Sequence, residues 1–230
     1  MNDIPPPATT RSAVIFDALR ADILGGFFEP GSRLQFTKLV ERYQCSIGSL
    51  REALQRLSEV GLAESIAQQG FRVIAVSNED LRDLVEARME IEVTVLRHAI
   101  RHGDISWEGS CIAALHMLDR TPRHVGSSDF LSESWTIAHA TFHQTLLEGC
   151  PNGRLLGVAA RLRDVAELYR HWTTTHDDDL NGAANAEHHA ILDAALARDA
   201  EQAGNLLRAH IERAHAPLRP RAAQLGGAIQ

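Results

Sequence analysis

The chain has 230 residues, of which 44% are hydrophobic and 23% charged, with a net charge of −7. This composition fits one large or two ordinary globular domains and excludes collagen, a disordered tail protein and a coiled-coil rod. No apolar run approaches the ~18–20 residues that span a bilayer, and the first ten residues lack the pattern of a secretory signal. Three widely spaced cysteines favour a reducing compartment. We therefore expect a cytoplasmic protein without membrane association.

The charge is distributed unevenly along the chain. Residues 1–76 contain 8 basic and 8 acidic residues, whereas residues 77–230 contain 15 basic and 22 acidic residues and so carry the whole net charge. An acidic surface repels a polyanion such as DNA. The first third of the chain is therefore the part that can approach nucleic acid.

The first third has the pattern of a small DNA-binding module. Its expected elements are, in order, a disordered arm over 1–10, helices over 12–24, 37–43 and 46–60, and strands over 62–66 and 71–76. Ser46 is the expected N-cap of the third helix, and Gln68-Gln69-Gly70 forms the tip of the hairpin. Three helices and a hairpin predict a winged helix-turn-helix domain over residues 11–76.

The rest of the chain is expected to be all-helical. The helical period continues after Ser77, interrupted only by Gly-, Pro- or Asp-containing breaks. The expected helices lie near 78–102, 106–120, 128–149, 152–175, 181–198 and 200–215. They predict a six-helix bundle over 77–216, followed by a loose tail over 217–230. The whole protein is thus expected to be mostly α.

The third helix is the candidate for insertion into the major groove of DNA, because such a helix needs polar residues near its N-terminus that reach base edges. Arg51 is expected to contact bases, and Ser46 and Ser49 to contact phosphate or bases. Gln69 and Gly70 are expected to place the wing tip at the minor groove. Further candidates for phosphate contacts are Arg11, Arg20, Lys38, Arg42 and Arg56. The alternative is a three-helix adaptor whose charges are merely solvated.

A family resemblance favours DNA binding. Glu29-Pro30-Gly31, the segment SIGSLREALQRL from Ser46 to Leu57, and Gly70 resemble, in order and spacing, the GntR family of bacterial transcription regulators. The resemblance implies a winged helix that binds short palindromes as a dimer. The FadR-like members use three arginines on DNA. Only the last is present here, as Arg51, whereas Thr37 and Ile47 occupy the other positions, so we expect a different operator.

Four of the twelve histidines accompany apolar helical stripes. His139 and His143 lie four residues apart on one helix face, and His188 and His210 lie on the two last helices. Four nitrogens from three helices can converge on one metal ion, whereas four buried imidazoles without partners would be costly. His189 points about 100° away from His188 around the helix and is left out. The alternative is four separate core or surface histidines.

This segment resembles the FCD ligand-binding domain of the FadR-like branch, which often holds a divalent metal through one Asp and three His. The match includes the 22 residues from His188 to His210, with His139 at the position of the Asp. An all-imidazole set favours zinc, with nickel or copper as alternatives, over magnesium or calcium. The resemblance also places Arg88 at the effector cavity; the alternative is a surface ion pair between Arg88 and Glu92. The strings RYQCSIGSLREAL, HATFH and LLEGC resemble the repressors of glutarate and related dicarboxylate use.

The sequence therefore predicts a dimeric DNA-binding regulator, not an enzyme, whose operator binding responds to a small carboxylate at a metal site of one ion per chain. A regulator that senses the metal itself is the second hypothesis. A His-rich metalloenzyme is the third, but HATFH lacks the glutamate that follows the first histidine in zinc proteases, and Glu187, at i−1 from His188, is expected to point elsewhere.

Overall fold

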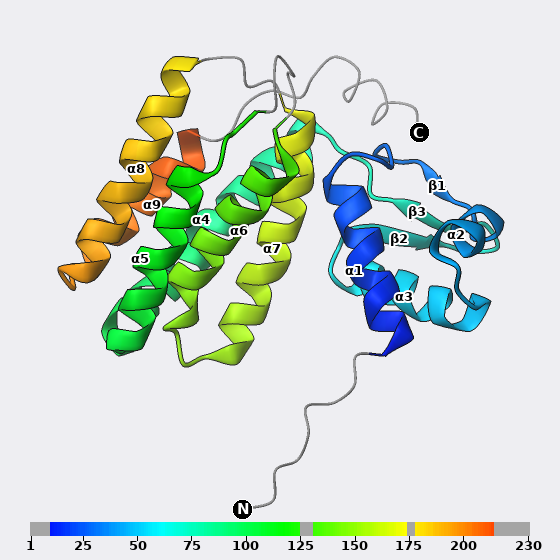
Figure 1. Cartoon of the computed structure of the whole chain (residues 1–230), viewed down its shortest axis with the longest axis horizontal. Helices are drawn as coiled ribbons and strands as arrows, with labels where there is room; N and C mark the ends of the chain where they lie inside the picture. The colour runs from blue at the N-terminus through cyan, green and yellow to red at the C-terminus, as the bar shows by residue number, and fades with distance from the viewer. Residues whose placement is uncertain (1–9, 125–130, 174–177, 214–230) are drawn as a thin grey trace, which may run out of the picture. The chain divides into compact units, whose positions relative to one another are not determined.

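The computed structural model describes residues 10–124, 131–173 and 178–213, with the backbone alone for 178–184. The chain divides into two compact units, the first ending at Ala75 and the second beginning at Val76. Figure 1 shows the mixed helix-and-strand composition of the first unit and the helices of the second. The expected arm, except Thr10, and the expected tail over 217–230 lie outside the described residues. The prediction of a mostly α protein is confirmed.

The first unit is a winged helix-turn-helix, as predicted. Its elements are α1 (Arg11–Leu24), β1 (Arg33–Leu34), α2 (Phe36–Tyr43), α3 (Ile47–Glu59), β2 (Ala63–Ile66) and β3 (Gly70–Val73). The predicted two-stranded hairpin is in fact part of a three-stranded antiparallel sheet in the order β1-β3-β2. The sequence pattern missed β1 because two residues are too few to show an alternation. Gly31, at φ 74°, makes the turn that brings β1 to β3.

The apolar faces of α1 and α3 form the core of this unit. Leu19 and Ile23 of α1 and Leu50, Leu54 and Leu57 of α3 have no exposed surface. The predicted N-cap is confirmed, since the Ser46 hydroxyl accepts a hydrogen bond from the Ser49 N–H at 3.1 Å. This burial fixes the orientation of α3 and leaves its opposite face for solvent or a partner.

The second unit contains six helices among the described residues: α4 (Asn78–His102), α5 (Ile105–Arg120), α6 (Glu133–Glu148), α7 (Gly153–Trp172), α8 (Asp178–Leu196) and α9 (Ala200–Arg213). Two of the helix starts differ from the prediction by more than one residue. α6 does not extend back to residue 131, because Leu131 pairs with His124 in a β-bridge and the Ser132 hydroxyl caps the helix. α8 begins three residues before the expected position 181.

The start of α4 is held by a side chain of α7. Ser77 is the N-cap of α4, and its hydroxyl accepts from the Asp80 N–H. The Tyr169 hydroxyl of α7 accepts a hydrogen bond from the Ser77 N–H at 3.1 Å and donates one to the Asp80 carboxylate at 2.5 Å.

Among the described residues, no helix is both long and apolar enough to cross a membrane.

Two glycines allow α4, α5 and α6 to approach one another closely. A Cβ atom on Gly103 would lie 2.3 Å from the Trp107 ring, and one on Gly149 would lie 2.8 Å from the Ala99 carbonyl oxygen. The Trp107 indole is buried and donates to the Thr145 carbonyl at 3.0 Å. Neither glycine can be replaced without moving backbone or a buried ring.

We expect Gly103→Ala to lower the free energy of unfolding by about 1–3 kcal/mol, because overpacking forces the Trp107 ring or the helix end to shift. The matched control is Gly109→Ala on α5, where an added Cβ meets nothing within 4 Å. That change should raise the free energy by about 0.5–1 kcal/mol, since alanine favours a helix interior. Urea unfolding of both variants measures the difference, and equal effects would contradict the packing argument.

Candidate functional site

The exposed side of α3 presents the residues predicted to read DNA. Arg51 is exposed, and its guanidinium lies 5.4 Å from the centre of the Phe36 ring of α2. Ile47 is 59% exposed in the first turn of α3. Gln44, at φ 48°, closes the tight turn between α2 and α3. The two helices are thus arranged as a helix-turn-helix with Arg51 and Ile47 available to a partner.

The other predicted DNA contacts lie on the same unit. Lys38 on α2 and Gln69 at the wing tip are exposed. Gly70 adopts φ 88°, in the left-handed region that glycine tolerates without strain. The Ser46 and Ser49 hydroxyls lie 3.0 Å apart and bond to each other, so DNA would have to compete with that bond. Arg11 donates to the Gln44 carbonyl at 2.8 Å, which places it beside the turn that precedes α3.

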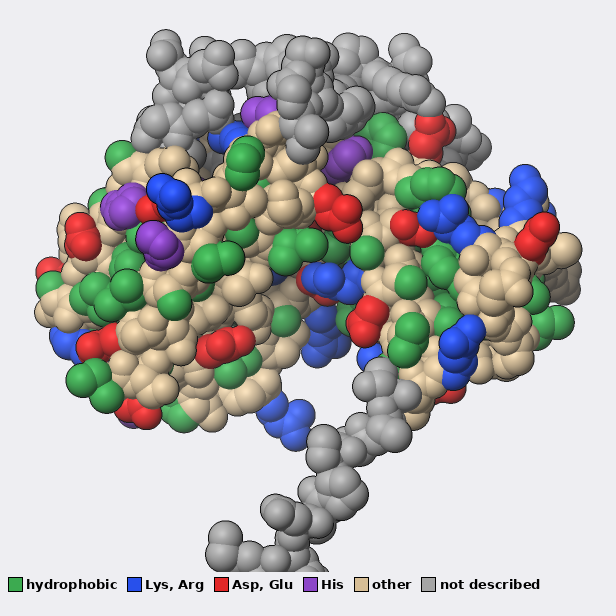
Figure 2. All heavy atoms as spheres, viewed as in Figure 1, with side chains coloured by type: hydrophobic (Ala, Val, Ile, Leu, Met, Phe, Trp, Pro, Cys, Tyr) green, Lys and Arg blue, Asp and Glu red, His purple; other side chains and the backbone are tan. Residues whose placement is uncertain are grey.

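Two of the arginines expected to bind phosphate also have contacts within the unit. Arg42 bonds to Asp22 at 2.9 Å, and its guanidinium lies 3.7 Å from the centre of the Phe27 ring. Arg56 lies 4.3 Å from the centre of the Phe16 ring. Basic and acidic side chains are interspersed on the face shown in Figure 2. The geometry therefore gives Arg42 and Arg56 a role in holding α1 against the helix-turn-helix.

The helical unit brings the four predicted histidines together. His139 and His143 come from α6, His188 from α8 and His210 from α9, and each is at most 7% exposed. One ring nitrogen of each lies within 4.8 Å of the corresponding nitrogens of the others. The Nε2 atoms of His139 and His143 are 3.2 Å apart. We call these four residues the histidine cluster. Its donor set fits a transition-metal ion, and four protein nitrogens leave one or two positions open if the ion is five- or six-coordinate.

Burial keeps these imidazoles neutral. Desolvation lowers the pKa of all four rings below the usual value, and that of His188 to about 2. Within the described residues, neither nitrogen of His188 has a hydrogen-bond partner. A buried imidazole without a partner is costly, and a neutral imidazole is the form that binds metal. Both observations fit a metal-ligating role better than a packing role.

Glu187 holds one of the cluster histidines, which the sequence analysis did not foresee. Its Oε2 lies 2.8 Å from His210 Nδ1, and its Oε1 accepts from Arg213 Nε at 2.6 Å. Burial opposes its ionisation, but the hydrogen bonds from His210 and Arg213 outweigh this and lower the pKa of Glu187 to about 2. An ionised carboxylate only accepts, so His210 carries its proton on Nδ1 and its Nε2 lone pair is available. The expectation that Glu187 points elsewhere was wrong, because α9 packs beside it.

A group of buried and partly buried charged side chains borders the histidine cluster. Arg88 Nε donates to Glu92 at 2.6 Å, and Arg163 Nη1 donates to the same carboxylate at 3.1 Å. Arg170 Nε donates to Glu167 at 3.2 Å. Burial works against ionisation of Glu92, but Arg88 and Arg163 outweigh it and hold its pKa below the usual value. The predicted pairing of Arg88 with Glu92 is therefore present, but it is buried and not on the surface.

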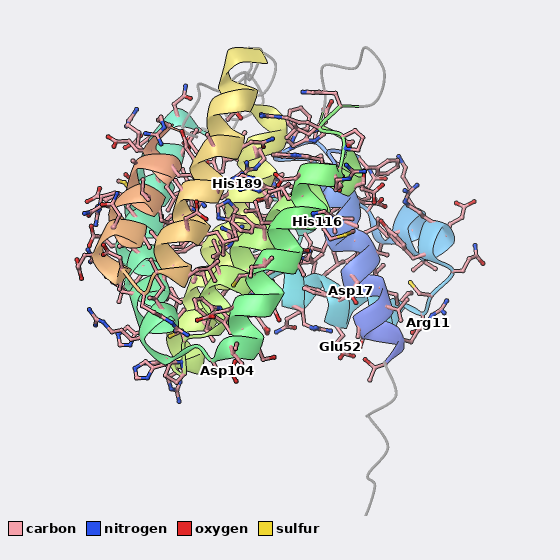
Figure 3. All side chains as sticks on the ribbon, turned by 60° about the vertical axis from the view of Figure 1, so that its left-hand side comes forward. Arg11, Asp17, Glu52, Asp104, His116 and His189 are labelled. Carbon is pink, nitrogen blue, oxygen red and sulfur yellow. The ribbon has the colours of Figure 1, made fainter. Side chains whose placement is uncertain are left out.

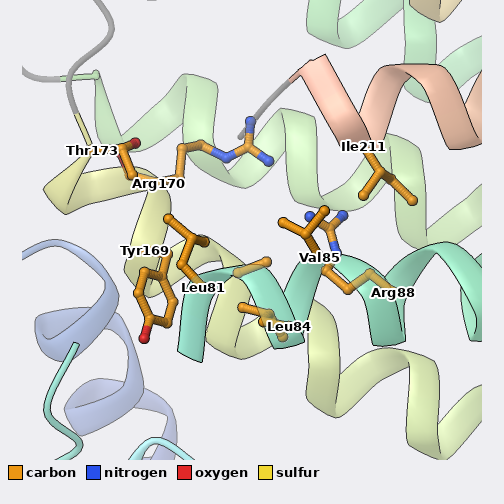
Figure 4. Close-up of a pocket in the computed structure, with 9 residues that line it drawn as sticks. Leu81, Leu84, Val85, Arg88, Tyr169, Arg170, Thr173 and Ile211 are labelled. Atoms are coloured by element: carbon orange, nitrogen blue, oxygen red, sulfur yellow. The ribbon is translucent and has the colours of Figure 1, made fainter. Parts of the chain in front are cut away.

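A small cavity of about 30 Å³ lies beside these ions. Arg88 from α4 and Arg170 from α7 both line it, and Figure 4 shows them among the side chains around it. The rest of its wall is largely apolar, formed by Leu81, Leu84, Val85, Ala166, Tyr169, Thr173 and Ile211. Arg170 also lies 3.4 Å from Nε2 of His139, so the cavity adjoins the histidine cluster. Its chemistry suits a small anion with an apolar body.

The surface histidines separate clearly from the cluster. His116 and His189 lie on the outside of the helical unit (Figure 3), and His189 Nε2 is 2.9 Å from Asp119 Oδ2.

Three charged residues of α7 near the histidine cluster were not predicted from the sequence: Arg163, Glu167 and Arg170. Their spacing of i, i+4 and i+7 places all three on one face of α7, together with the buried Ala166. Charged residues on a stripe that also carries buried positions were the available signal.

Comparisons with known proteins agree with this two-part organisation. The family model for bacterial regulatory proteins of the gntR family matches residues 11–73, and that for the FCD domain matches residues 83–213. The chain is 37% identical over 216 residues to the uncharacterized HTH-type transcriptional regulator BphR of Paraburkholderia xenovorans LB400, covering 90% of this chain and 85% of that protein. It is 33% identical over 196 residues to the HTH-type transcriptional repressor GlaR of Escherichia coli K12, covering 84% and 89%. A solved GntR regulator from Rhodococcus sp. RHA1 has a TM-score of 0.68 and 26% identity, over 96% of this chain and 99% of that one.

His188→Leu separates a ligand role from a packing role. In chelator-treated protein we expect an unchanged or raised melting temperature, because two buried nitrogens without partners are removed at similar volume. With zinc present we expect the variant to melt at a lower temperature than wild type. A bound ion stabilises the folded state by mass action, and the variant lacks one of the ligands that hold it. Thermal unfolding with zinc and with chelator provides the comparison. The same sign under both conditions would make His188 a packing residue.

Proposed function

Since the chain belongs to the GntR family of bacterial transcriptional regulators, with an FCD domain behind its DNA-binding domain, we propose that a small carboxylate bound at a metal in the FCD domain controls its affinity for an operator. DNA-binding regulation is the premise; the metal, the carboxylate and the homodimer are the proposal. The observation that carries it is the histidine cluster, four buried imidazoles with ligand atoms within 4.8 Å of one another.

The donor set indicates which metal would bind. Four neutral imidazoles suit zinc first, and also nickel or copper, whereas magnesium and calcium require oxygen ligands. When bound, the ion supplies a Lewis-acidic anchor for a carboxylate oxygen. His139, His143, His188 and His210 would hold the ion, and Glu187 would fix the ring of His210 through Nδ1.

The charge of the surrounding ions favours an anionic effector. Arg88 and Arg163 are buried and Arg170 is partly buried, against the buried carboxylates of Glu92 and Glu167. A divalent ion would add to this positive excess, and a carboxylate would offset it. Arg88 lines the cavity and can present its terminal nitrogens to a second carboxylate as a fork. We therefore propose small mono- or dicarboxylates as the effectors.

Operator recognition requires two copies of the winged helix. One α3 gives too small a contact for a specific site, whereas two related by a two-fold axis read a palindrome. α4 follows β3 in the chain after a few residues. A shift of α4 on carboxylate binding would thereby change the spacing of the two α3 helices. By reciprocity, the carboxylate must bind the DNA-free dimer more tightly, and a tenfold effect corresponds to about 1.4 kcal/mol.

A regulator that senses the metal itself is the second candidate, supported by the same cluster. The two candidates differ in what releases DNA. A chelator releases the operator from a metal sensor without any carboxylate, whereas a carboxylate releases it from the proposed switch while the metal stays bound. The metalloenzyme hypothesis has weaker support, since Glu187 is engaged by His210 and Arg213 and the family matches are regulators.

Arg51→Ala should weaken binding to the preferred operator by about 1–3 kcal/mol and relax its sequence preference, because a base contact is lost. Lys38→Ala is the matched control, since a phosphate contact serves all sequences alike. Its loss should weaken binding to every DNA similarly and reduce the salt dependence. Fluorescence anisotropy with the selected operator and a scrambled duplex at several salt concentrations measures both. Unchanged sequence preference in Arg51→Ala would show that α3 is not the reading helix.

Purified protein should contain about one zinc, nickel or similar ion per chain, and His143→Ala and His210→Ala should each lose it. Calorimetry with acetate and glutarate should show binding to metal-loaded protein and weaker binding to His143→Ala. Added operator should reduce carboxylate affinity by the same factor by which carboxylate reduces operator affinity. Carboxylate binding that is equal with and without metal would refute the anchor. Release of operator by chelator alone would favour the metal sensor.

A further inference from the structure

We propose that Arg170 is the specificity-determining residue of the effector site: it donates to the free oxygen of the carboxylate whose other oxygen is on the metal. This inference rests on the proposed function and deepens it. It assigns the metal-bound carboxylate of the effector to a residue of α7, and it leaves Arg88 for any second carboxylate. The observation that motivates it is the position of the Arg170 guanidinium beside the histidine cluster.

Arg170 is directed at a candidate ligand atom. Its Nη1 lies 3.4 Å from Nε2 of His139, and that same Nε2 lies 3.2 Å from Nε2 of His143. The Nε2 lone pair of His139 can either accept a hydrogen from Arg170 or bind an ion, but not both. A metal at the cluster would therefore displace this contact and leave the Arg170 donor directed at the site.

A guanidinium and a metal ion at such close range repel each other. Desolvation is the main cause that lowers the pKa of His139, His188 and His210, and the positive charge of Arg170 lowers it further in all three. An anion between the two cations removes the repulsion. A carboxylate can do so, because it has one oxygen for the metal and a second that accepts from Arg170.

The surroundings of Arg170 hold it in place for this role. Glu167 accepts from its Nε at 3.2 Å, so the terminal nitrogens point away from that carboxylate. The Trp135 ring centre lies 6.0 Å from the guanidinium carbon and 4.8 Å from the His139 ring centre. Arg170 also lines the cavity described above (Figure 4). A fixed donor at the border of cavity and cluster is preorganised for a ligand that touches both.

The two buried arginines, Arg88 and Arg163, are less suited to this position. Arg163 donates to Glu92 at 3.1 Å, and Arg88 donates to the same carboxylate at 2.6 Å. Of these three arginines, Arg170 is the one whose described contacts include a hydrogen bond to a nitrogen of the histidine cluster. The geometry therefore assigns the metal-bound carboxylate to Arg170 and any second carboxylate to Arg88.

The test uses full-length zinc-loaded protein and acetate, which has a single carboxylate. Arg170→Gln should bind acetate at least about tenfold more weakly, a loss of about 1.4 kcal/mol, while its zinc affinity stays the same or rises because a neighbouring cation is gone. Arg88→Gln should keep acetate affinity within about twofold and weaken glutarate. Calorimetry measures the carboxylates, and competition with a chromophoric chelator measures zinc. Arg161→Gln, on the exposed side of α7, is the matched control.

Arg170→Lys is the control for misfolding, because it keeps the positive charge and loses only the planar fork. It should retain zinc and bind acetate with an affinity between those of wild type and Arg170→Gln. Acetate affinity equal to wild type in Arg170→Gln would overturn the inference and leave the proposed function intact. Loss of zinc from a folded Arg170→Gln would also overturn it, because Arg170 would then support the metal site itself. Absence of acetate binding to wild type would overturn the proposed function and, with it, this assignment.

Discussion

The burial of four neutral imidazoles is the constraint on which the helical unit depends. Each ring has two polar nitrogens, and the interior of α6, α8 and α9 offers few partners for them. Such a cluster is tolerated only if something compensates for the lost hydration. Glu187 compensates at His210 Nδ1, and Arg170 contacts His139 Nε2. One ring nitrogen of each histidine lies within 4.8 Å of the corresponding nitrogens of the others, which is the arrangement that a metal ion requires.

The ions around the cluster follow from the same constraint. Buried charges persist when they are paired, and Glu92 joins two arginines from α4 and α7 in one network. This network ties α4 to α7 on the side where the cavity lies. A ligand that enters the cavity therefore meets an electrostatic framework that already links the two helices, so it can change their relative position only by altering those pairs.

Much of the fold could be predicted from the sequence because its signals are local. Helical periodicity placed the helices of both units within a few residues, and Ser46 marked the start of α3. The two-residue strand β1 left no periodic trace, and the start of α6 depends on a bridge between His124 and Leu131 that the sequence pattern does not reveal. Local signals predict elements well where each element is long enough to repeat its pattern.

The candidate site could be predicted only in part. The apolar stripes beside the histidines and the resemblance to the FCD domain together predicted the cluster, but the partners of those histidines depend on how distant helices pack. Glu187 contacts a residue 23 positions later, and Arg170 contacts one 31 positions earlier. A helical-wheel argument treats each helix alone and therefore assigned Glu187 to an uninvolved face. The side chains that orient the ligands are thus the part that required the three-dimensional structure.

The hydroxyl of Tyr169 also bears on how this protein can be joined to others. Because it bonds to both the Ser77 N–H and the Asp80 carboxylate, the first turn of α4 is structurally part of the helical unit, as is the buried Val76. A chimaera that exchanges the DNA-binding unit should therefore be spliced between Val73 and Val76. A junction inside α4 would separate Tyr169 from its partners and leave a sensor domain whose connecting helix has lost its anchor.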